Sequence, residues 1–305
     1  MIVKTEFSNM QVDTAQLTTM HELDLQALKK QGNEFITSVG VYKTNNNECH
    51  YRYNPDKTYM NVSTVSGYNA SLRYAGEKMG VNILQSRIDF RFDSIDYTYQ
   101  KLYKQNRLLL LLVAYKYNFK NLMNTDDPFE LNEKSIKVQD VKGSNWHYAF
   151  EFYNKRICNP DSGIECRLEF RVNDIALSDV PEDEKADYYL QEVIAMCRSV
   201  VNQRDQTFTK FVQAQNKHLL RKWNEEVIQE QRYKQPLSKF LAKYADCFYT
   251  SFQVTEFIKS LGYTRYNDVS KDMRRKINFH LFSKKELAEY VDMIEAAAKK
   301  FREVT

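Results

Sequence analysis

Polar and apolar positions alternate with a period of two in several segments of the first 175 residues. Such alternation is typical of strands that bury one face, and turn residues such as Asn, Asp, Pro and Gly separate the segments. Residues 69–79 and 96–118 instead predict two helices, and the polar, weakly periodic residues 1–34 predict one or two short ones. Six segments have the strand pattern: 34–44, 48–54, 58–67, 86–93, 145–153 and 164–172.

After Pro181 the pattern changes, because apolar residues recur at helical spacing as far as Thr305. The predicted fold class is therefore α+β, with an antiparallel β-sheet and packed helices followed by a mostly helical C-terminal part. We expect two domains, at residues 1–180 and 181–305, with the boundary somewhere in 178–204.

Three of the predicted strands, 86–93, 145–153 and 164–172, have one apolar and one polar face, since successive side chains point to opposite sides. The polar face has two interpretations. It is either a solvated face with cross-strand ion pairs, or a site where carboxylates bind a divalent cation that receives a phosphodiester together with arginines. Its residues are Arg87, Asp89, Arg91, Asp93, His147, Glu151, Tyr153, Glu165, Arg167, Glu169 and Arg171.

Tyr153 is the candidate nucleophile on this face. A phenol has a pKa of about 10, so attack on phosphorus near neutral pH needs a cation or a base that favours the phenolate. An ion with oxygen ligands, such as Mg²⁺ or Mn²⁺, would polarise a phosphate oxygen and stabilise the leaving 3′ oxygen. Three residues lie close enough in sequence to help the phenol: His147, Lys155 and Arg156.

Composition narrows the class of protein further. Of the 305 residues 43% are hydrophobic, which is enough for one large domain or two smaller ones. The longest apolar run, 108–115, is shorter than the roughly 20 residues of a membrane span, and the first residues have no signal-peptide pattern. No membrane is expected, and the cytoplasm is the expected location. The five cysteines include no CxxC pair, which argues against zinc and disulfides.

The C-terminal part has an excess of positive charge. From Arg204 onward there are 20 lysines and arginines against 13 acids, whereas the preceding residues have 24 against 27. This excess is typical of a nucleic-acid surface, although a solvated helical face also produces it. Segment 253–280 predicts two helices with a turn at Gly262, either a helix-turn-helix that enters a major groove or an ordinary hairpin. The second helix has four cations: Lys271, Arg274, Arg275 and Lys276.

Three of the strands contain short motifs in order: "SRIDFRFD" at 86–93, "FEFYNKR" at 150–156 and "CRLEFRV" at 166–172. In this order they resemble the Rep_trans family of rolling-circle plasmid replication initiators, which also includes relaxases of some conjugative transposons. The resemblance extends more loosely over residues 35–175. It implies that Tyr153 becomes joined to the 5′ phosphate at a DNA nick.

The resemblance also implies a metal site and DNA contacts. The acids of the flanking strands correspond to Asp89 and Glu169 as ligands of the ion, with Asp93 as a further candidate. The chain departs from the family at Ser63 and Cys158, where we expect acids. The candidate DNA-binding residues are Lys155, Arg156, Arg167, Lys271, Arg274 and Arg275.

The implied function is a rolling-circle replication initiator. It would bind a double-stranded origin with a locally single-stranded segment and nick one strand by metal-dependent transesterification, leaving a 5′-phosphotyrosine and a free 3′ hydroxyl as a primer. Two alternatives stay open. A relaxase of an integrative or conjugative element would use the same chemistry, and a non-catalytic DNA-binding regulator would have the same fold without the cleavage.

Other signatures are missing from the sequence. No two of the five histidines form a His-x-His pair, which disfavours the metal site of the other large class of nicking enzymes. No GxxxxGK[ST] loop is present, so no nucleotide cofactor is expected and strand separation would require a host helicase. Segment 284–304 is amphipathic, which favours packing or a homodimer over membrane binding.

Overall fold

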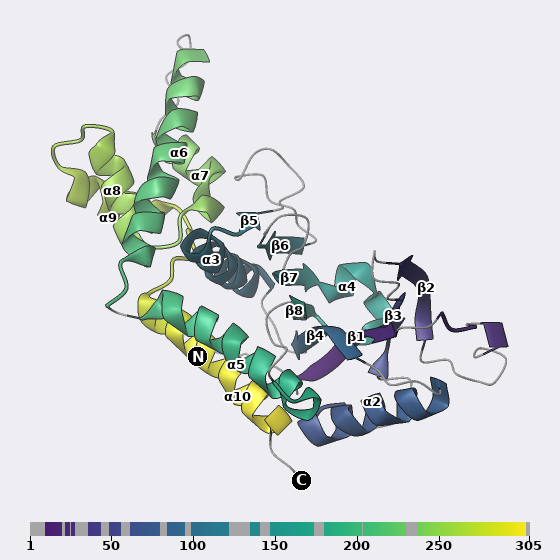
Figure 1. Cartoon of the computed structure of the whole chain (residues 1–305). Coiled ribbons are helices and arrows are strands. Elements are labelled where there is room, and N and C mark those ends of the chain that lie inside the picture. Colours follow the sequence, from purple (N-terminus) through teal and green to yellow (C-terminus); the bar gives the residue numbers. More distant parts are fainter. Residues whose placement is uncertain are drawn as a thin grey trace.

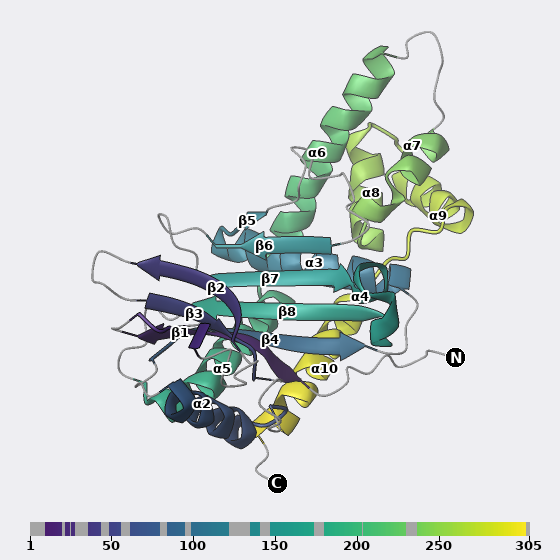
Figure 2. The ribbon, with the colours of Figure 1, turned by 90° about the vertical axis from the view of Figure 1, so that its right-hand side faces the viewer.

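The structure is a computed structural model of the whole chain, and it confirms the predicted α+β fold class. Within the part of the chain that the structure describes, an eight-stranded sheet has helices on one face and is followed by a mostly helical C-terminal part (Figure 1, Figure 2). The residues that the structure describes are 10–19, 22–24, 26–27, 36–43, 49–55, 62–79, 84–94, 99–121, 135–140, 147–173, 180–202, 204–229 and 237–302.

The strand order of the sheet is β2-β3-β1-β4-β8-β7-β6-β5, and the pairs are antiparallel. The central pairs β4–β8 and β7–β8 have continuous registers, so the three predicted motif strands lie side by side. The strands are β1 (Gln11–Thr19), β2 (Ile36–Lys43), β3 (Cys49–Tyr53), β4 (Leu84–Ser94), β5 (Lys120–Asn121), β6 (Ser135–Gln139), β7 (Tyr148–Asn154) and β8 (Cys166–Asn173).

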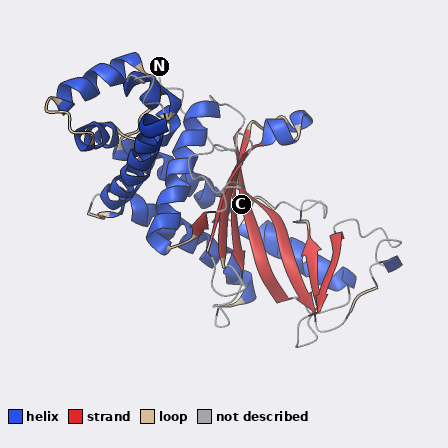
Figure 3. Cartoon of the chain, turned by 90° about the horizontal axis from the view of Figure 1, so that it is seen from above, coloured by secondary structure: helices blue, strands red, loops and turns tan. Residues whose placement is uncertain are grey.

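Four helices cover one face of the sheet, as Figure 1 shows. They are α2 (Val65–Met79), α3 (Tyr99–Tyr117), α5 (Glu182–Val201) and α10 (Lys284–Arg302). Figure 3 shows from above how the remaining C-terminal helices extend away from the strands. These helices are α6 (Thr207–Gln229), α7 (Leu237–Lys243), α8 (Ser251–Ser260) and α9 (Tyr266–Lys276).

The face toward the helices is apolar, as the period-two pattern predicts. Phe152 of β7 lies 6.1 Å, between ring centroids, from Tyr103 of α3, and Phe90 of β4 lies 6.1 Å from Phe301 of α10. Removing each phenyl ring from water stabilises the fold by about 1.5–3 kcal/mol. Burial of alternate side chains therefore fixes which residues of β4, β7 and β8 face away from the helices.

The buried apolar side chains form two clusters. The larger one extends from Met10 to Phe301 and includes β-strands, α3, α5, the first half of α6 and α10. The smaller one begins at Leu219 and is built by the second half of α6 with α7, α8 and α9. Because the larger cluster takes members from both sides of residues 180 and 181, the predicted domain boundary stays a prediction.

The helix predicted near residues 14–32 is wrong for 14–19, which belong to β1, the third strand in the sheet order. The register of β1 against β4 is shifted between Val12 and Thr14, so Asp13 is an extra residue in the strand. Such a bulge places polar residues next to each other in the sequence. The period of two is therefore broken in β1, and the pattern resembles a polar helix.

The predicted strand 58–67 is also wrong at its end, because Val65 begins α2. Thr64 Oγ1 accepts a hydrogen bond from the backbone N–H of Gly67 at 3.0 Å, an N-terminal cap that favours a helix over a strand. Residues 58–61 lie outside the described residues, as do 123–134 of the polar segment 123–135, for which the sequence predicts a loop; Ser135 begins β6. Sequence patterns also missed the short strands β5 and β6. Among the described helices, none combines the length and apolar character that crossing a membrane requires.

Candidate active site

The polar residues of β4, β7 and β8 face away from the helices, and Figure 2 looks onto that face with α3, α5 and α10 behind the strands. The antiparallel registers set Asp89 opposite Arg171 and Asp93 opposite Arg167. Tyr153 of β7 is also opposite Arg167, on the other side of β8. The three motifs that are far apart in the sequence therefore contribute to one polar surface, as the strand patterns predict.

Tyr153 is the hydroxyl at the centre of the candidate site. Its Oη donates a hydrogen bond to Oε1 of Glu169 at 2.6 Å. Burial raises the pKa of the Tyr153 phenol, and the negative charge of Glu169 raises it further. The phenol is therefore protonated at neutral pH in this arrangement, and its proton points at a carboxylate that can accept it. The Lys155 ammonium lies 5.7 Å from the centre of the Tyr153 ring.

Arg171 holds three carboxylates together beside the phenol. Its Nη2 lies 2.9 Å from Oε2 of Glu169 and 3.1 Å from Oε2 of Glu151, and its Nε lies 3.6 Å from Oδ2 of Asp89. Glu151 and Glu169 are directly opposite each other in the β7–β8 register, where like charges repel. The guanidinium relieves this repulsion. Burial raises the pKa of Glu169, and the hydrogen bonds from Tyr153 and Arg171 oppose that rise.

Arg167 forms a second group of ion pairs. Its Nε and Nη2 donate to the two oxygens of Asp93 at 2.6 and 3.1 Å, a bidentate pair. Its Nη1 donates to Oδ1 of Asp13 at 3.1 Å, and Asp13 also accepts from Arg91 at 2.7 Å. The bulge of β1 therefore supplies a carboxylate to the polar surface. Arg167 was predicted to bind phosphate, but it is only 7% exposed and its guanidinium binds carboxylates in the structure.

Asp89, a predicted metal ligand, is 1% exposed and fully engaged. It accepts hydrogen bonds from Thr14 Oγ1 at 2.8 Å and from Arg87 Nη2 at 2.6 Å, besides its contact with Arg171. Three cationic or hydroxyl partners satisfy a carboxylate that would otherwise be costly to bury. Asp89 therefore acts as a structural anchor between β1, β4 and β8 in this conformation.

The predicted metal ligands do not fit a divalent ion in the arrangement observed. Asp89 and Glu169 share Arg171, whereas Asp93 turns toward Arg167. A hard cation requires several oxygen ligands around one point, and guanidinium groups take that place here. Within the described ranges, no group of three His, Cys, Asp or Glu residues is arranged to hold a metal. The metal site stays a prediction.

Other predicted residues lie at the edge of this surface. Lys155 and Arg156 begin α4 (Lys155–Cys158), which follows directly on β7. His147 precedes β7, and its backbone N–H donates to Asp140 at 2.7 Å. No contact is observed between the His147 ring and Tyr153. Sequence reasoning gave no role to Asp13 or Thr14, because the segment was expected to be helical. It placed Glu151 and Arg171 on the polar face without assigning either a function.

The predicted helix, turn and second helix in the C-terminal part are confirmed. Gly262, with a φ of 85°, lies in the turn between α8 and α9, where this left-handed conformation favours glycine. The hydroxyls of Thr255 and Ser270 hold the two helices together at 2.8 Å. The cations are exposed at the end of α9, and Lys276 pairs with Asp272 at 2.6 Å. The contact residues predicted there, Lys271, Arg274 and Arg275, do not lie in the sheet that holds Tyr153 (Figure 1).

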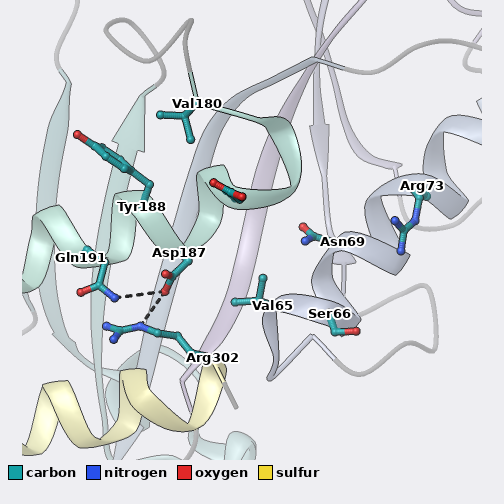
Figure 4. A pocket seen from close by; sticks show the side chains of 10 residues that line it. Val65, Ser66, Asn69, Arg73, Val180, Asp187, Tyr188, Gln191 and Arg302 are labelled. Atoms are coloured by element: carbon teal, nitrogen blue, oxygen red, sulfur yellow. Dashed lines mark hydrogen bonds and ion pairs between the residues drawn. The ribbon is translucent and has the colours of Figure 1, made fainter. Parts of the chain in front are cut away.

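A pocket of about 560 Å³ lies elsewhere, where the ends of α2, α5 and α10 meet. Figure 4 shows Asp187 and Arg302 paired across it, with 2.7 Å between Oδ1 and Nε, and Tyr188 at its edge. All three helices cover the apolar face of the sheet. The pocket is therefore on the opposite side of the sheet from Tyr153 and does not belong to the candidate active site.

Comparison with known proteins adds little to this site. No family model matches the chain, and no curated protein matches it. Among solved structures, a rolling circle replication initiator protein from Geobacillus stearothermophilus aligns with 60% of this chain and 84% of its own, at 12% sequence identity and a TM-score of 0.29. So loose a superposition supports no conclusion about this chain, and the Rep_trans resemblance stays a prediction from the motifs.

Proposed function

We propose that the protein is a DNA nickase and strand transferase that initiates rolling-circle replication. Tyr153 attacks a phosphodiester, a bond forms between its Oη and phosphorus, and the bond from phosphorus to the 3′ oxygen breaks. The products are a 5′-phosphotyrosine and a free 3′ hydroxyl, which primes synthesis. The observation that carries this proposal is the 2.6 Å hydrogen bond from the Tyr153 hydroxyl to Glu169, on a surface lined with arginines.

Each neighbouring group has a part in this reaction. Glu169 accepts the phenol proton as the oxygen attacks, because the two groups already share a hydrogen bond. The leaving 3′ oxygen takes a proton from Glu169 or from water. Arg171 positions the Glu169 carboxylate, because the same guanidinium is also fixed by its ion pair with Glu151. Lys155, beside the Tyr153 ring, and the exposed Arg156 attract the DNA backbone.

The remaining parts of the proposal concern partners and cofactor. The basic end of α9 binds the double-stranded origin, and the polar surface receives a locally single-stranded segment. A divalent ion such as Mg²⁺ or Mn²⁺ would supply charge stabilisation at the phosphate if Asp89, Glu169 or Asp93 exchanged arginine for metal. A host helicase separates the strands, and a homodimer brings a second copy to the origin. A relaxase of an integrative element would act on its transfer origin by the same chemistry.

One observation favours the non-catalytic alternative. The acids expected to bind the ion are neutralised by arginines, which is also how a solvated or structural sheet face is built. A DNA-binding regulator would keep this network and never form a covalent intermediate. Formation of a covalent protein–DNA intermediate therefore distinguishes the nickase from the regulator.

The test is an adduct assay on supercoiled DNA that contains the origin region of the element encoding the protein, with Mg²⁺ or Mn²⁺ added. Wild-type protein should produce open circles and a protein–DNA adduct that survives denaturation. Tyr153→Phe should produce neither, because the attacking oxygen is gone. The matched control is Tyr148→Phe, on the same strand but with its hydroxyl bonded to Glu192 on the other face. An adduct with Tyr153→Phe, or none with wild type, would overturn the proposal.

A further inference from the structure

The short helix α4 and the 3-10 turn η2 (Pro160–Ser162) join β7 to β8 and form an exposed projection beside Tyr153. Figure 1 shows α4 on the side of β7 opposite to α3, which is the side of the polar surface. Ile157 is 50% exposed, more than any other large hydrophobic side chain that the structure describes. A single exposed apolar side chain is common on protein surfaces, so the position of Ile157 beside cations and Tyr153, and not its exposure alone, points to a ligand.

The projection is held in one conformation. Asn154, which ends β7, accepts a hydrogen bond on its side-chain oxygen from the backbone N–H of Ile157 at 3.1 Å. The backbone N–H of Lys155 donates to Glu165 at 3.0 Å, and Asn159 donates to Lys155 at 2.7 Å. These bonds fix the backbone around Ile157 to the ends of both central strands. The backbone that carries the sec-butyl side chain of Ile157 is therefore already ordered before a ligand binds, which keeps the cost in conformational entropy low.

The projection is also tied to the candidate nucleophile. Lys155 extends over the Tyr153 ring at 5.7 Å, so the first residue of α4 contacts the residue that would attack DNA. Arg156 is next to Ile157 and is 71% exposed. An exposed apolar tip that follows two cations and stands four residues after a candidate nucleophile fits a partner that has phosphates and flat apolar bases. Proteins insert isoleucine and similar side chains between base steps in this way.

We propose that Ile157 is a wedge that supports an unstacked base next to the scissile phosphate, while Lys155 and Arg156 bind the flanking phosphates. This inference rests on the proposed function and adds to it how the strand is opened at the nick. In a duplex the phosphates lie outside but are held at a regular spacing by pairing and stacking, and a strand with one unstacked step can bend a phosphate toward the Tyr153 hydroxyl. The ligand class is a nucleobase at the junction between paired and unpaired DNA.

The test measures binding without cleavage, in buffer free of divalent ions. The probes are a short duplex with a central mismatched bubble that contains 2-aminopurine, and the same duplex fully paired. Wild type should prefer the bubble and raise the 2-aminopurine fluorescence, which increases as the base unstacks. Ile157→Ala should lose about tenfold in affinity for the bubble, the size of one lost apolar contact, and change its affinity for the paired duplex less than about twofold.

Two control variants separate the wedge from charge and from general surface effects. Arg156→Gln should weaken binding to both probes alike, because phosphate contacts do not depend on base stacking. Tyr188→Ala removes a 40% exposed aromatic from α5, on the helical side of the sheet, and should leave both affinities unchanged. Ile157→Leu should restore the preference for the bubble. Equal preference in wild type and Ile157→Ala would overturn the wedge.

Cys158 gives a second readout, since it is exposed and the other four cysteines are buried. A bubble base with a tethered activated disulfide should exchange with the Cys158 thiol and release the tether's leaving thiol, whereas the same tether in the paired arm should react slowly. Equal rates in bubble and arm would contradict the placement. Neither readout involves cleavage, so a failed wedge leaves the Tyr153 adduct standing, and a missing adduct refutes the nickase without being mistaken for a failed wedge.

Discussion

At the scale of single residues, the polar surface places several charges where water is scarce. Asp89 is 1% exposed and Glu169 is 4% exposed, and each is contacted by arginine and by a hydroxyl. Removing one partner of such a buried network typically costs 3–5 kcal/mol, because a charge is left uncompensated. The orientation of the Tyr153 hydroxyl toward Glu169 is therefore a by-product of a network that the fold itself requires.

Glu169→Gln tests whether this carboxylate accepts the phenol proton. The amide keeps an acceptor for the Tyr153 hydroxyl but has a negligible affinity for the proton. We expect the rate of adduct formation to fall by about 10²–10⁴-fold, the usual contribution of a general base. Single-turnover adduct formation on origin DNA is the measurement, with circular dichroism to show that the variant is folded.

The control for this prediction is Glu151→Gln. Glu151 contacts the same guanidinium of Arg171, at 3.1 Å, but not the Tyr153 hydroxyl. The two variants therefore share any effect of loosening Arg171. An equal loss of rate in both would mean that Glu169 only supports Arg171 and takes no proton.

At the scale of elements, regular burial patterns were predictable and irregular ones were not. Strands β4, β7 and β8 alternate without interruption, so both their faces and the location of Tyr153 followed from the sequence. Strand β1 has a bulge at Asp13, and its two neighbouring polar residues concealed a central strand. The site was therefore predicted only in part, because Asp13 and Thr14 come from that strand. The pairing of each acid with an arginine depends on cross-strand register, which no single-strand pattern contains.

The basic helix α9 provides a prediction at this scale. Arg274, Arg275 and Lys276 lie in its last turn, where they also complement the helix dipole, and Lys271 lies in the middle of the helix. If Lys271 and Arg275 each neutralise a phosphate, the double variant Lys271→Gln/Arg275→Gln should lower the slope of log affinity against log salt by about 1.8, or 0.9 per contact. Fluorescence anisotropy with origin duplex over a salt series measures this slope.

A matched substitution outside α9 controls for net charge. Lys285→Gln removes an 84% exposed cation at the start of α10. It should leave the slope unchanged within about 0.3, since screened charges beyond the contact surface release few counterions. An identical change in slope for Lys285→Gln would mean that α9 has no special place in DNA binding.

At the scale of the whole molecule, a buried lysine joins the sheet platform to the smaller helical cluster. Lys104 of α3 is 2% exposed, and its ammonium donates to the backbone carbonyls of Ala245, at 3.0 Å, and Phe279. It lies 5.9 Å from the ring centre of Tyr249, and the negative charge of Asp246 favours its protonated form. One side chain thus bonds to both connections of the smaller cluster, before α8 and after α9.

Lys104 makes stability depend on pH in an unusual direction. Burial lowers its pKa from 10.5 to about 8, so between these values the folded protein binds fewer protons than the unfolded chain. The penalty for the buried charge is present in full below pH 8, and the free energy of unfolding rises as the pH increases toward 10.5. The gain from this group is on the order of 3 kcal/mol.

The measurement compares wild type with Lys104→Met by chemical denaturation at pH 7 and pH 10. Other groups titrate in both proteins, so the difference between their free energies of unfolding isolates Lys104. That difference should shift in favour of wild type at the higher pH. Lys285→Met, with an exposed lysine removed, should show a constant difference. A constant difference for Lys104→Met as well would refute the pKa shift.

The chain leaves the larger core along α6, forms the smaller helical cluster, and returns to the larger core at α10. The smaller cluster is thus an insert between two helices, α6 and α10, that both pack in the larger core. A segment of this kind can be exchanged as a unit while the host remains intact. Under the proposed function, exchange of this insert alone would change the DNA sequence that is bound and leave the polar surface around Tyr153 unchanged.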